Sequence, residues 1–293
     1  MKLTNKLTIF GSSFKFGQMK DGVQKAPSEM SELGIASKLI SLGNNVRHYG
    51  MIYPKRKDTT NRTVGYYTAN LARKVFQERK DNRRILNIGG DHSVAIGSIN
   101  GILEHDPNTI IIWIDAHSDI NTIESSPSGN FHGMPLAFLT GLDNPTKLSK
   151  SKYLNPKLKF DSLALLGIRD LDKFEKDIIK RHNILNFTTS DIKKKGYNYT
   201  MYNALANLDP TSSRPIYISF DIDVLDPDIA KGTGTLAKNG VSVENIFGVL
   251  DYLRNTGRVI GMDMVEVNPA LDTSGDTVRI AMQCIERVFD KRT

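Results

Sequence analysis

Cysteine is almost absent from this sequence of 293 residues. The one cysteine, Cys284, has no partner within the chain, so an intrachain disulfide is excluded. The disulfide frameworks that hold small secreted domains together are therefore excluded too, and a reducing compartment is favoured. Cys284 stands in an apolar periodic stretch, where we expect a small core residue.

Long apolar runs are also missing. No segment approaches the roughly 20 apolar residues that a membrane-spanning helix needs. Residues Met1–Phe10 lack the apolar run of a secretion signal. We therefore expect a cytoplasmic protein without a membrane partner.

The excess of positive charge, +7, raises the alternative of a nucleic-acid-binding protein. The basic runs at Lys55–Lys57, Arg83–Arg84 and Lys193–Lys195 are short, scattered and not interleaved with aromatic residues. Such runs are more typical of solvated faces, so we expect no nucleic-acid partner.

Short apolar runs alternate with longer amphipathic stretches along the chain. Runs such as Ile110–Ile114 are almost continuously hydrophobic, which is typical of parallel strands covered on both faces. We predict helices over Glu29–Leu42, Thr63–Gln77, Val94–Glu104, from the N-cap Ser242 to the stop at Gly257, and over Thr277–Phe289. We predict strands at Leu7–Ser12, Asn45–Gly50, Arg84–Ile88, Thr109–Asp115, Ser162–Ile168, Ile184–Phe187, Pro215–Asp221 and Arg258–Val267. The alternation predicts one α/β domain over residues 1–293, with helices on both faces of the sheet.

Polar clusters follow three of these strands, where open parallel sheets bind their ligands. They are Gly89–Ser93 with His92, Asp115–Asp119 with His117 between two aspartates, and Ser219–Pro227 with Asp221 and Asp223. If the backbone is extended, Asp115, His117 and Asp119 all face one side. The alternative for this cluster is a capped strand end with hydrogen-bonded carboxylates.

A metal centre accounts best for the clusters together. Buried carboxylates are costly unless a positive charge compensates them. A set rich in carboxylates with some imidazole suits hard cations, and the imidazole favours manganese over magnesium. Such a set can hold two ions that share and activate a water molecule. The candidate ligands are His92, Asp115, His117, Asp119, Asp221 and Asp223.

The clusters resemble the motifs of the ureohydrolase family, which includes arginases and agmatinases. Gly-Gly-Asp-His-Ser (89–93), Asp-Ala-His-Ser-Asp (115–119), Ser-Phe-Asp-Ile-Asp-Val-Leu-Asp-Pro (219–227) and Val-Glu-Val-Asn-Pro (265–269) occur in the family's order. The resemblance implies a three-layer αβα fold around an eight-stranded parallel sheet, two Mn²⁺ ions, and homotrimers or hexamers. Asp115 and Asp221 are then the bridging carboxylates. His92 and Asp119 complete one ion's shell, and His117 and Asp223 the other's.

One loop resembles the arginase version of the family rather than the agmatinase version. Its Asn121, Ser128 and Asn130 match positions that bind the α-carboxylate of L-arginine, a group that agmatine lacks. Unpaired donors there reject a substrate without the carboxylate. Asp172 matches the residue that receives the α-amino group, with Glu175 assisting. The alternatives are a self-capping Ser/Asn-rich turn and an acidic helix start.

Three further residues carry roles that the resemblance implies. Glu266 pairs with the substrate guanidinium, His132 shuttles protons or assists the leaving group, and Thr235 lies near the guanidinium. The implied reaction is hydrolysis of L-arginine to L-ornithine and urea by a metal-bridging hydroxide, with Asp119 passing a proton to the leaving nitrogen. An agmatinase, another guanidino-substrate ureohydrolase and a catalytically silent metal-binding relative are the alternatives.

The sequence departs from the usual arginase pattern in two loops. Lys231 precedes Gly232–Thr235 where Pro-Ala is usual, and Glu124 and Pro127 are added in the carboxylate-binding loop. These departures affect loop conformation or charge, but they remove no candidate metal ligand.

Overall fold

One parallel sheet forms the centre of the computed structural model, which describes residues 4–54 and 58–292. Within those residues the sheet has eight strands in the order β2-β1-β3-β8-β7-β4-β5-β6. They are β1 (Lys6–Ser12), β2 (Asn45–Ile52), β3 (Arg84–Ile88), β4 (Ile110–Ile114), β5 (Leu163–Ile168), β6 (Leu185–Thr188), β7 (Ile216–Asp221) and β8 (Val259–Val265). Every predicted strand is present, with its ends shifted by a few residues at most.

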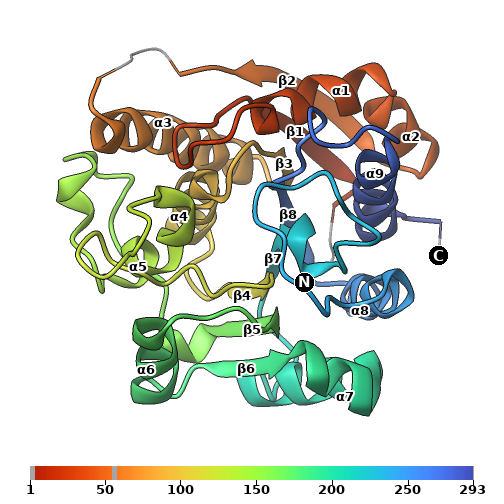
Figure 1. Ribbon diagram of the computed structural model, residues 1–293. Helices are drawn as coiled ribbons and strands as arrows, with labels where there is room; N and C mark the ends of the chain where they lie inside the picture. Colours follow the sequence, from red (N-terminus) through yellow and green to blue (C-terminus); the bar gives the residue numbers. More distant parts are fainter. Residues whose placement is uncertain (1–3, 55–57, 293) are drawn as a thin grey trace.

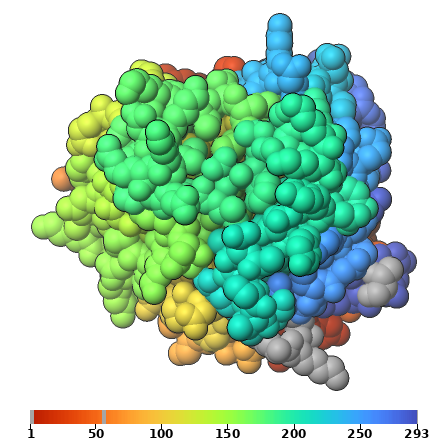
Figure 2. Space-filling model, turned by 90° about the horizontal axis from the view of Figure 1, so that it is seen from below, coloured from red at the N-terminus to blue at the C-terminus, as the bar shows by residue number. Residues whose placement is uncertain are grey.

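Helices cover both faces of the sheet (Figure 1). One apolar core lies between the sheet and α1 (Ala26–Glu32), α2 (Ile35–Ser41), α7 (Thr189–Leu208), α8 (Val243–Asn255) and α9 (Asp276–Phe289). A second core lies between the opposite face and α3 (Thr60–Lys80), α4 (Ala95–His105), α5 (Pro135–Thr140) and α6 (Lys173–Arg181). In the view from below, the segments around α6 and α7 lie side by side on the same face of the molecule (Figure 2). The predicted three-layer fold is confirmed.

The helices differ from the sequence prediction in some places. The helix predicted over Glu29–Leu42 is two helices, because Gly34 adopts a left-handed φ of 79° between them. The prediction also lacked α5, α6 and α7, and α7 itself is interrupted at Gly196, whose φ is 81°. Ser242 caps α8 as predicted, accepting a hydrogen bond from the Asn245 N–H, and Gly257 ends the segment with a φ of 67°. Among the described residues, no helix is long and apolar enough to cross a membrane.

The sheet order brings the four polar motifs together. The motifs follow β3, β4, β7 and β8, and these strands are consecutive across the sheet as β3-β8-β7-β4. Because the strands are parallel, their carboxyl ends lie at one edge, which is the expected ligand-binding edge of such a sheet. Strands far apart in the sequence thus present their polar residues to one place.

Candidate active site

His92 is held in a fixed orientation directly after β3. The turn that carries it, His92–Val94, is capped by Asp91, whose carboxylate accepts the Ser93 N–H. The imidazole stacks on Trp113, with ring centroids 4.0 Å apart and planes 7° apart. Its Nε2 lies 2.9 Å from the Ser219 Oγ. The other ring nitrogen, Nδ1, faces the carboxylates of the site.

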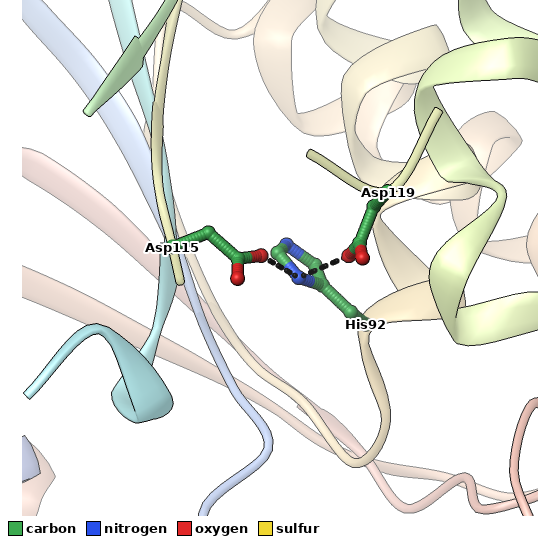
Figure 3. Close-up of side chains that lie close together, drawn as sticks. All are labelled: His92, Asp115 and Asp119. Carbon is green, nitrogen blue, oxygen red and sulfur yellow. Dashed lines mark ion pairs between the residues drawn. The ribbon is translucent and has the colours of Figure 1, made fainter. Parts of the chain in front are cut away.

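Three carboxylates surround the His92 Nδ1. Asp119 Oδ2 lies 3.0 Å away, Asp115 Oδ2 3.1 Å and Asp221 Oδ2 3.2 Å. Figure 3 shows Asp115 and Asp119 approaching this nitrogen from opposite sides. Among the described residues the buried Nδ1 has no partner in hydrogen-bonding geometry. A buried ring nitrogen without a hydrogen bond, surrounded by carboxylate oxygens, fits a shared cation.

A second group of ligand atoms adjoins the first. His117 Nδ1 lies 3.1 Å from Asp223 Oδ2 and 3.4 Å from Asp115 Oδ1. His92, Asp115 and Asp119 form one group of potential metal ligands, and Asp115, His117 and Asp223 form the other. Asp115 belongs to both groups and contacts each imidazole through a different oxygen. This arrangement can hold two cations bridged by one carboxylate.

The electrostatics of the cluster also favour cations. Burial and then the charge of Asp115 raise the pKa of Asp119 to about 7. Burial, followed by neighbouring carboxylates, likewise raises the pKa of Asp221 and Asp223. For His92, burial lowers the pKa, but the three carboxylates outweigh it and raise the pKa well above the usual value. Without metal the cluster therefore binds protons where bound cations would lie, as expected for a metal centre.

The backbone between Asp115 and Asp119 bends rather than continuing as an extended strand. β4 ends at Ile114, the following residues form a bend, and Asp119 has a left-handed φ of 47°. The predicted convergence of Asp115, His117 and Asp119 is present, but alternation along a strand is the wrong explanation for it. Hydrogen bonds hold the bend, because the His117 N–H donates to Asp115 Oδ1 and the Ala116 N–H to Asp223 Oδ1.

Glu266 and His132 form a pair beside the cluster. The sequence predicts Glu266 within a strand, and that prediction is wrong. β8 ends at Val265, and Glu266 follows it with a φ of 60°. Its Oε1 accepts the His92 N–H at 2.7 Å and lies 3.0 Å from the His132 Nδ1. Burial lowers the pKa of His132, but the charge of Glu266 outweighs it and raises the pKa to about 9. In the metal-free chain His132 is therefore a cation at neutral pH and can donate a proton.

A cavity of about 260 Å³ opens above the cluster. Its lining includes the cluster's His117, Asp119, Asp221 and Asp223, and also His132. His92 and Asp115 are fully buried and lie beneath it. Of the predicted substrate-binding residues, Asn121, Ser128, Asp172, Glu175 and Thr235 line the cavity. Asn130 and Glu266 do not belong to this lining. The Asn130 N–H donates to Ser128 Oγ at 3.2 Å.

Asp172 and Glu175 serve the start of α6 as well as the cavity. They form a capping box in which Asp172 Oδ1 accepts the Glu175 N–H and Glu175 Oε2 accepts the Asp172 N–H. Their other oxygens face the cluster's loops, with Asn121 Nδ2 donating to Asp172 Oδ2 and Ser118 Oγ donating to Glu175 Oε1. The helix-start interpretation is thus correct, and it is compatible with a place in the cavity wall.

The sequence model of the arginase family matches residues 5–289 of this chain. The chain belongs to the arginase family. It is 39% identical over 302 residues to the arginase of Plasmodium berghei, with 93% of this chain and 85% of that protein covered. It is 36% identical over 301 residues to the arginase of Staphylococcus aureus, with 99% and 98% covered. The arginase structure from Bacillus caldovelox superposes with a TM-score of 0.92 at 31% identity, covering 100% of this chain and 99% of that one.

The loops that depart from the usual family pattern lie at the rim of the cavity. Pro127 is part of the lining, and the exposed Glu124 is paired with Lys147, which also contacts the buried Asp143. Lys231 is exposed and is not among the lining residues. Glu124 therefore links the outer side of this loop to Lys147 and, through it, to Asp143.

Sequence reasoning missed two contributors to the site. Asp170 lines the cavity, and Trp113 stacks on His92 and donates its Nε1–H to Asp115 Oδ2 at 3.1 Å. A signal for Trp113 was present, because it stands two residues before Asp115 and residues at this spacing share one side of a strand. Asp170 stands two residues before Asp172, in the same segment.

Proposed function

We propose that this chain hydrolyses L-arginine to L-ornithine and urea. The observation that carries the proposal is the position of Asp115, which contacts both His92 and His117 through different oxygens beneath the cavity. Membership of the arginase family supports hydrolysis of a guanidino group as the reaction. We also propose that residues 1–293 form a single catalytic domain.

The ligands that we assign to two metal ions are His92, Asp115, His117, Asp119, Asp221 and Asp223. Their carboxylate-rich chemistry with two imidazoles supports manganese as the metal. When bound, two such ions supply Lewis acidity and lower the pKa of a shared water molecule.

We assign the transfer of protons during the reaction to Asp119 and His132. Asp119 lines the cavity beside His132, and we assign to it the transfer of a proton to the leaving nitrogen. His132 lines the same cavity and exchanges protons with solvent, because its side chain is 20% exposed. Glu266 holds the imidazole of His132 through Oε1, and we assign its Oε2 to the substrate guanidinium.

The outer part of the cavity is assigned to the amino-acid end of the substrate. Asn121 and Ser128 lie in the lining, and with Asn130 they offer amide and hydroxyl donors to an α-carboxylate. Asp172 and Glu175 form the acidic wall that suits an α-ammonium group, and Thr235 closes the cavity on another side. Agmatine lacks the carboxylate, so it would leave the donors unpaired, which disfavours its binding.

The test is urea release from manganese-loaded protein, with L-arginine and agmatine compared in parallel. We expect urea from L-arginine, little from agmatine, and loss of activity in Asp119→Asn, which keeps the shape of the side chain but not its charge. Preference for agmatine would retain the metal centre and overturn the carboxylate assignment. If neither substrate releases urea while two manganese ions are bound, the chain acts on another guanidino compound or is a silent relative.

We further propose a cytoplasmic homo-oligomer, a trimer or a hexamer, without nucleic-acid or membrane partners. The buried, unpaired Cys284 supports a reducing compartment. Sedimentation of the purified protein tests the assembly, and a monomer at micromolar concentration would contradict it.

A further inference from the structure

Arg169 has an unusual set of hydrogen bonds at the end of β5. Its Nη2 donates to the carbonyls of Asp223 at 2.7 Å, Ala237 at 2.9 Å and Leu225 at 3.3 Å. Its Nη1 donates to the carbonyls of Val224 and Gly167, at 3.1 and 3.2 Å. The Nε–H donates to the Lys238 carbonyl at 3.0 Å. The guanidinium thus donates hydrogen bonds to main-chain oxygens of three separate segments.

The segments that Arg169 joins are parts of the site. Residues 223–225 are the turn after β7, which carries the candidate ligand Asp223. Residues 237–238 lie just beyond Thr235 of the cavity wall, and Gly167 belongs to β5. One side chain therefore fixes the spacing between the β5 end, a ligand-bearing turn and a wall of the cavity.

The main chain of the same residue contacts the segment that carries the other two ligands of that group. The Arg169 N–H donates to the Ala116 carbonyl at 2.8 Å, and Ala116 stands between Asp115 and His117. The Ala116 N–H in turn donates to Asp223 Oδ1 at 3.2 Å. Arg169 is thus bound by its backbone to the strand end that carries two ligands and by its side chain to the turn that carries the third.

Arginine is suited to this place and lysine is not. A guanidinium has five N–H groups in a rigid planar fork, whereas an ammonium has three donors on one atom. Only the fork can reach carbonyls on several sides while it stays in one plane. Burial lowers the pKa of Arg169, and nearby acids, Asp223 first, oppose this effect. A guanidinium stays protonated in proteins, so the group keeps its charge.

We propose that Arg169 is a positioning residue that sets the geometry of the Asp115–His117–Asp223 half of the metal centre. The proposal rests on the proposed function only in taking these residues as metal ligands. Contacts to groups around a metal's ligands typically change metal affinity by about 10–100-fold when they are removed. We therefore expect Arg169→Lys to weaken binding of one of two Mn²⁺ ions by about 10–100-fold, while the other ion keeps its affinity.

Arg214 provides a matched control. It is also half-buried, and it donates to the carbonyls of Asn108 and Leu208 at 2.8 and 2.9 Å and to Ser162 Oγ at 2.6 Å. It stands just before β7, at the end of the strand opposite the metal centre. Arg214→Lys therefore loses similar main-chain contacts without touching the site.

The experiment is titration calorimetry of Mn²⁺ into the metal-free full-length protein, its Arg169→Lys and Arg169→Gln variants, and Arg214→Lys. Thermal unfolding of the metal-free proteins checks that each is folded. We expect both Arg169 variants to lose one high-affinity step and Arg214→Lys to keep both. If Arg169→Lys, the variant that keeps the charge, binds both ions as the unsubstituted protein does, the proposal is overturned.

Three further outcomes can be distinguished from these. Equal weakening of both steps in Arg169→Lys and Arg214→Lys would mean a general loss of rigidity, which also overturns the proposal. If the unsubstituted protein binds two Mn²⁺ ions but releases no urea from L-arginine, the proposed function fails while the positioning role of Arg169 is still decided by the titrations. If the unsubstituted protein binds no Mn²⁺, both are overturned.

Discussion

Acidification should weaken manganese binding, and the pKa values of the cluster determine the pH range and the size of this effect. Metal ligands must be deprotonated, so every ligand that holds a proton in the metal-free protein must release it on binding. The pKa of Asp119 is raised from 3.8 to about 7, first by burial and then by the charge of Asp115. At pH 8 most Asp119 carboxyls are ionised, and at pH 6 most are protonated.

The size of the effect follows from this one carboxyl group. Between pH 8 and pH 6 its ionised fraction falls about 10-fold, which costs about 1.4 kcal/mol of binding free energy. His92 has a pKa well above its usual value, and the pKa of Asp221 is raised as well. Their protons add to the loss in the same direction. The apparent Kd for manganese should therefore rise at least about 10-fold from pH 8 to pH 6.

The stability of the metal-free protein changes with pH in the opposite direction to the manganese affinity. Because the folded pKa of Asp119 lies above its unfolded value, the folded chain holds this proton more tightly, and the metal-free protein loses stability as pH rises from about 4 to 7. Bound manganese removes that penalty, so the increase in Tm on metal loading should be larger at pH 8 than at pH 6.

Calorimetry in two buffers of different ionisation enthalpy measures the protons released. Asp119→Asn is the control, and its Kd should vary less with pH between 6 and 8 than that of the unsubstituted chain. A Kd that is constant over this range, with no proton release, would refute the assignment of these buried groups as ligands.

Three further perturbations test other parts of the site. Asp115→Asn removes the carboxylate shared by both ligand groups, so metal affinity and urea release should fall by more than the roughly 10–100-fold typical of contacts around ligands; retention of both ions would exclude a bridging role. Gly167→Ala places a Cβ 2.5 Å from Val224 Cγ2 at a φ of +91°, and should cost roughly 1–3 kcal/mol in chemical denaturation, whereas unchanged stability would contradict the close packing. Glu266→Gln should lower the pKa of His132 from about 9, as an NMR titration of the metal-free protein would show; the stability that His132 gains from its raised pKa is complete below its unfolded pKa and is lost as pH rises through about 9.

The sequence predicts the strands well because both faces of the sheet are covered. A run such as Ile110–Ile114 must be apolar throughout, which makes it visible without any knowledge of its neighbours. The helices are harder to predict. α7 is divided at Gly196, where the backbone leaves the helical region, so its apolar residues do not keep one period along the segment.

The identity of the cluster could also be predicted from the sequence, but its geometry could not. Turn residues and carboxylates after apolar runs identify His92, Asp115 and Asp221 as candidates. The order β3-β8-β7-β4 depends on which strands pair across the sheet, and that is decided by contacts between distant segments. The same applies to Arg169, whose side-chain partners lie 54 to 69 positions away along the chain, apart from the nearby Gly167.

The two acidic residues with left-handed backbones show why the site keeps strained positions. Asp119 has a φ of 47° and Glu266 a φ of 60°, and both follow strands that end at the site. Each directs its carboxylate back to His92, Asp119 to the ring nitrogen and Glu266 to the main-chain N–H. Glycine would relieve a strain of order 1–3 kcal/mol at each position but would remove the carboxylate. The strain is therefore retained because these positions keep a carboxylate in contact with His92, at the ring nitrogen for Asp119 and at the main chain for Glu266.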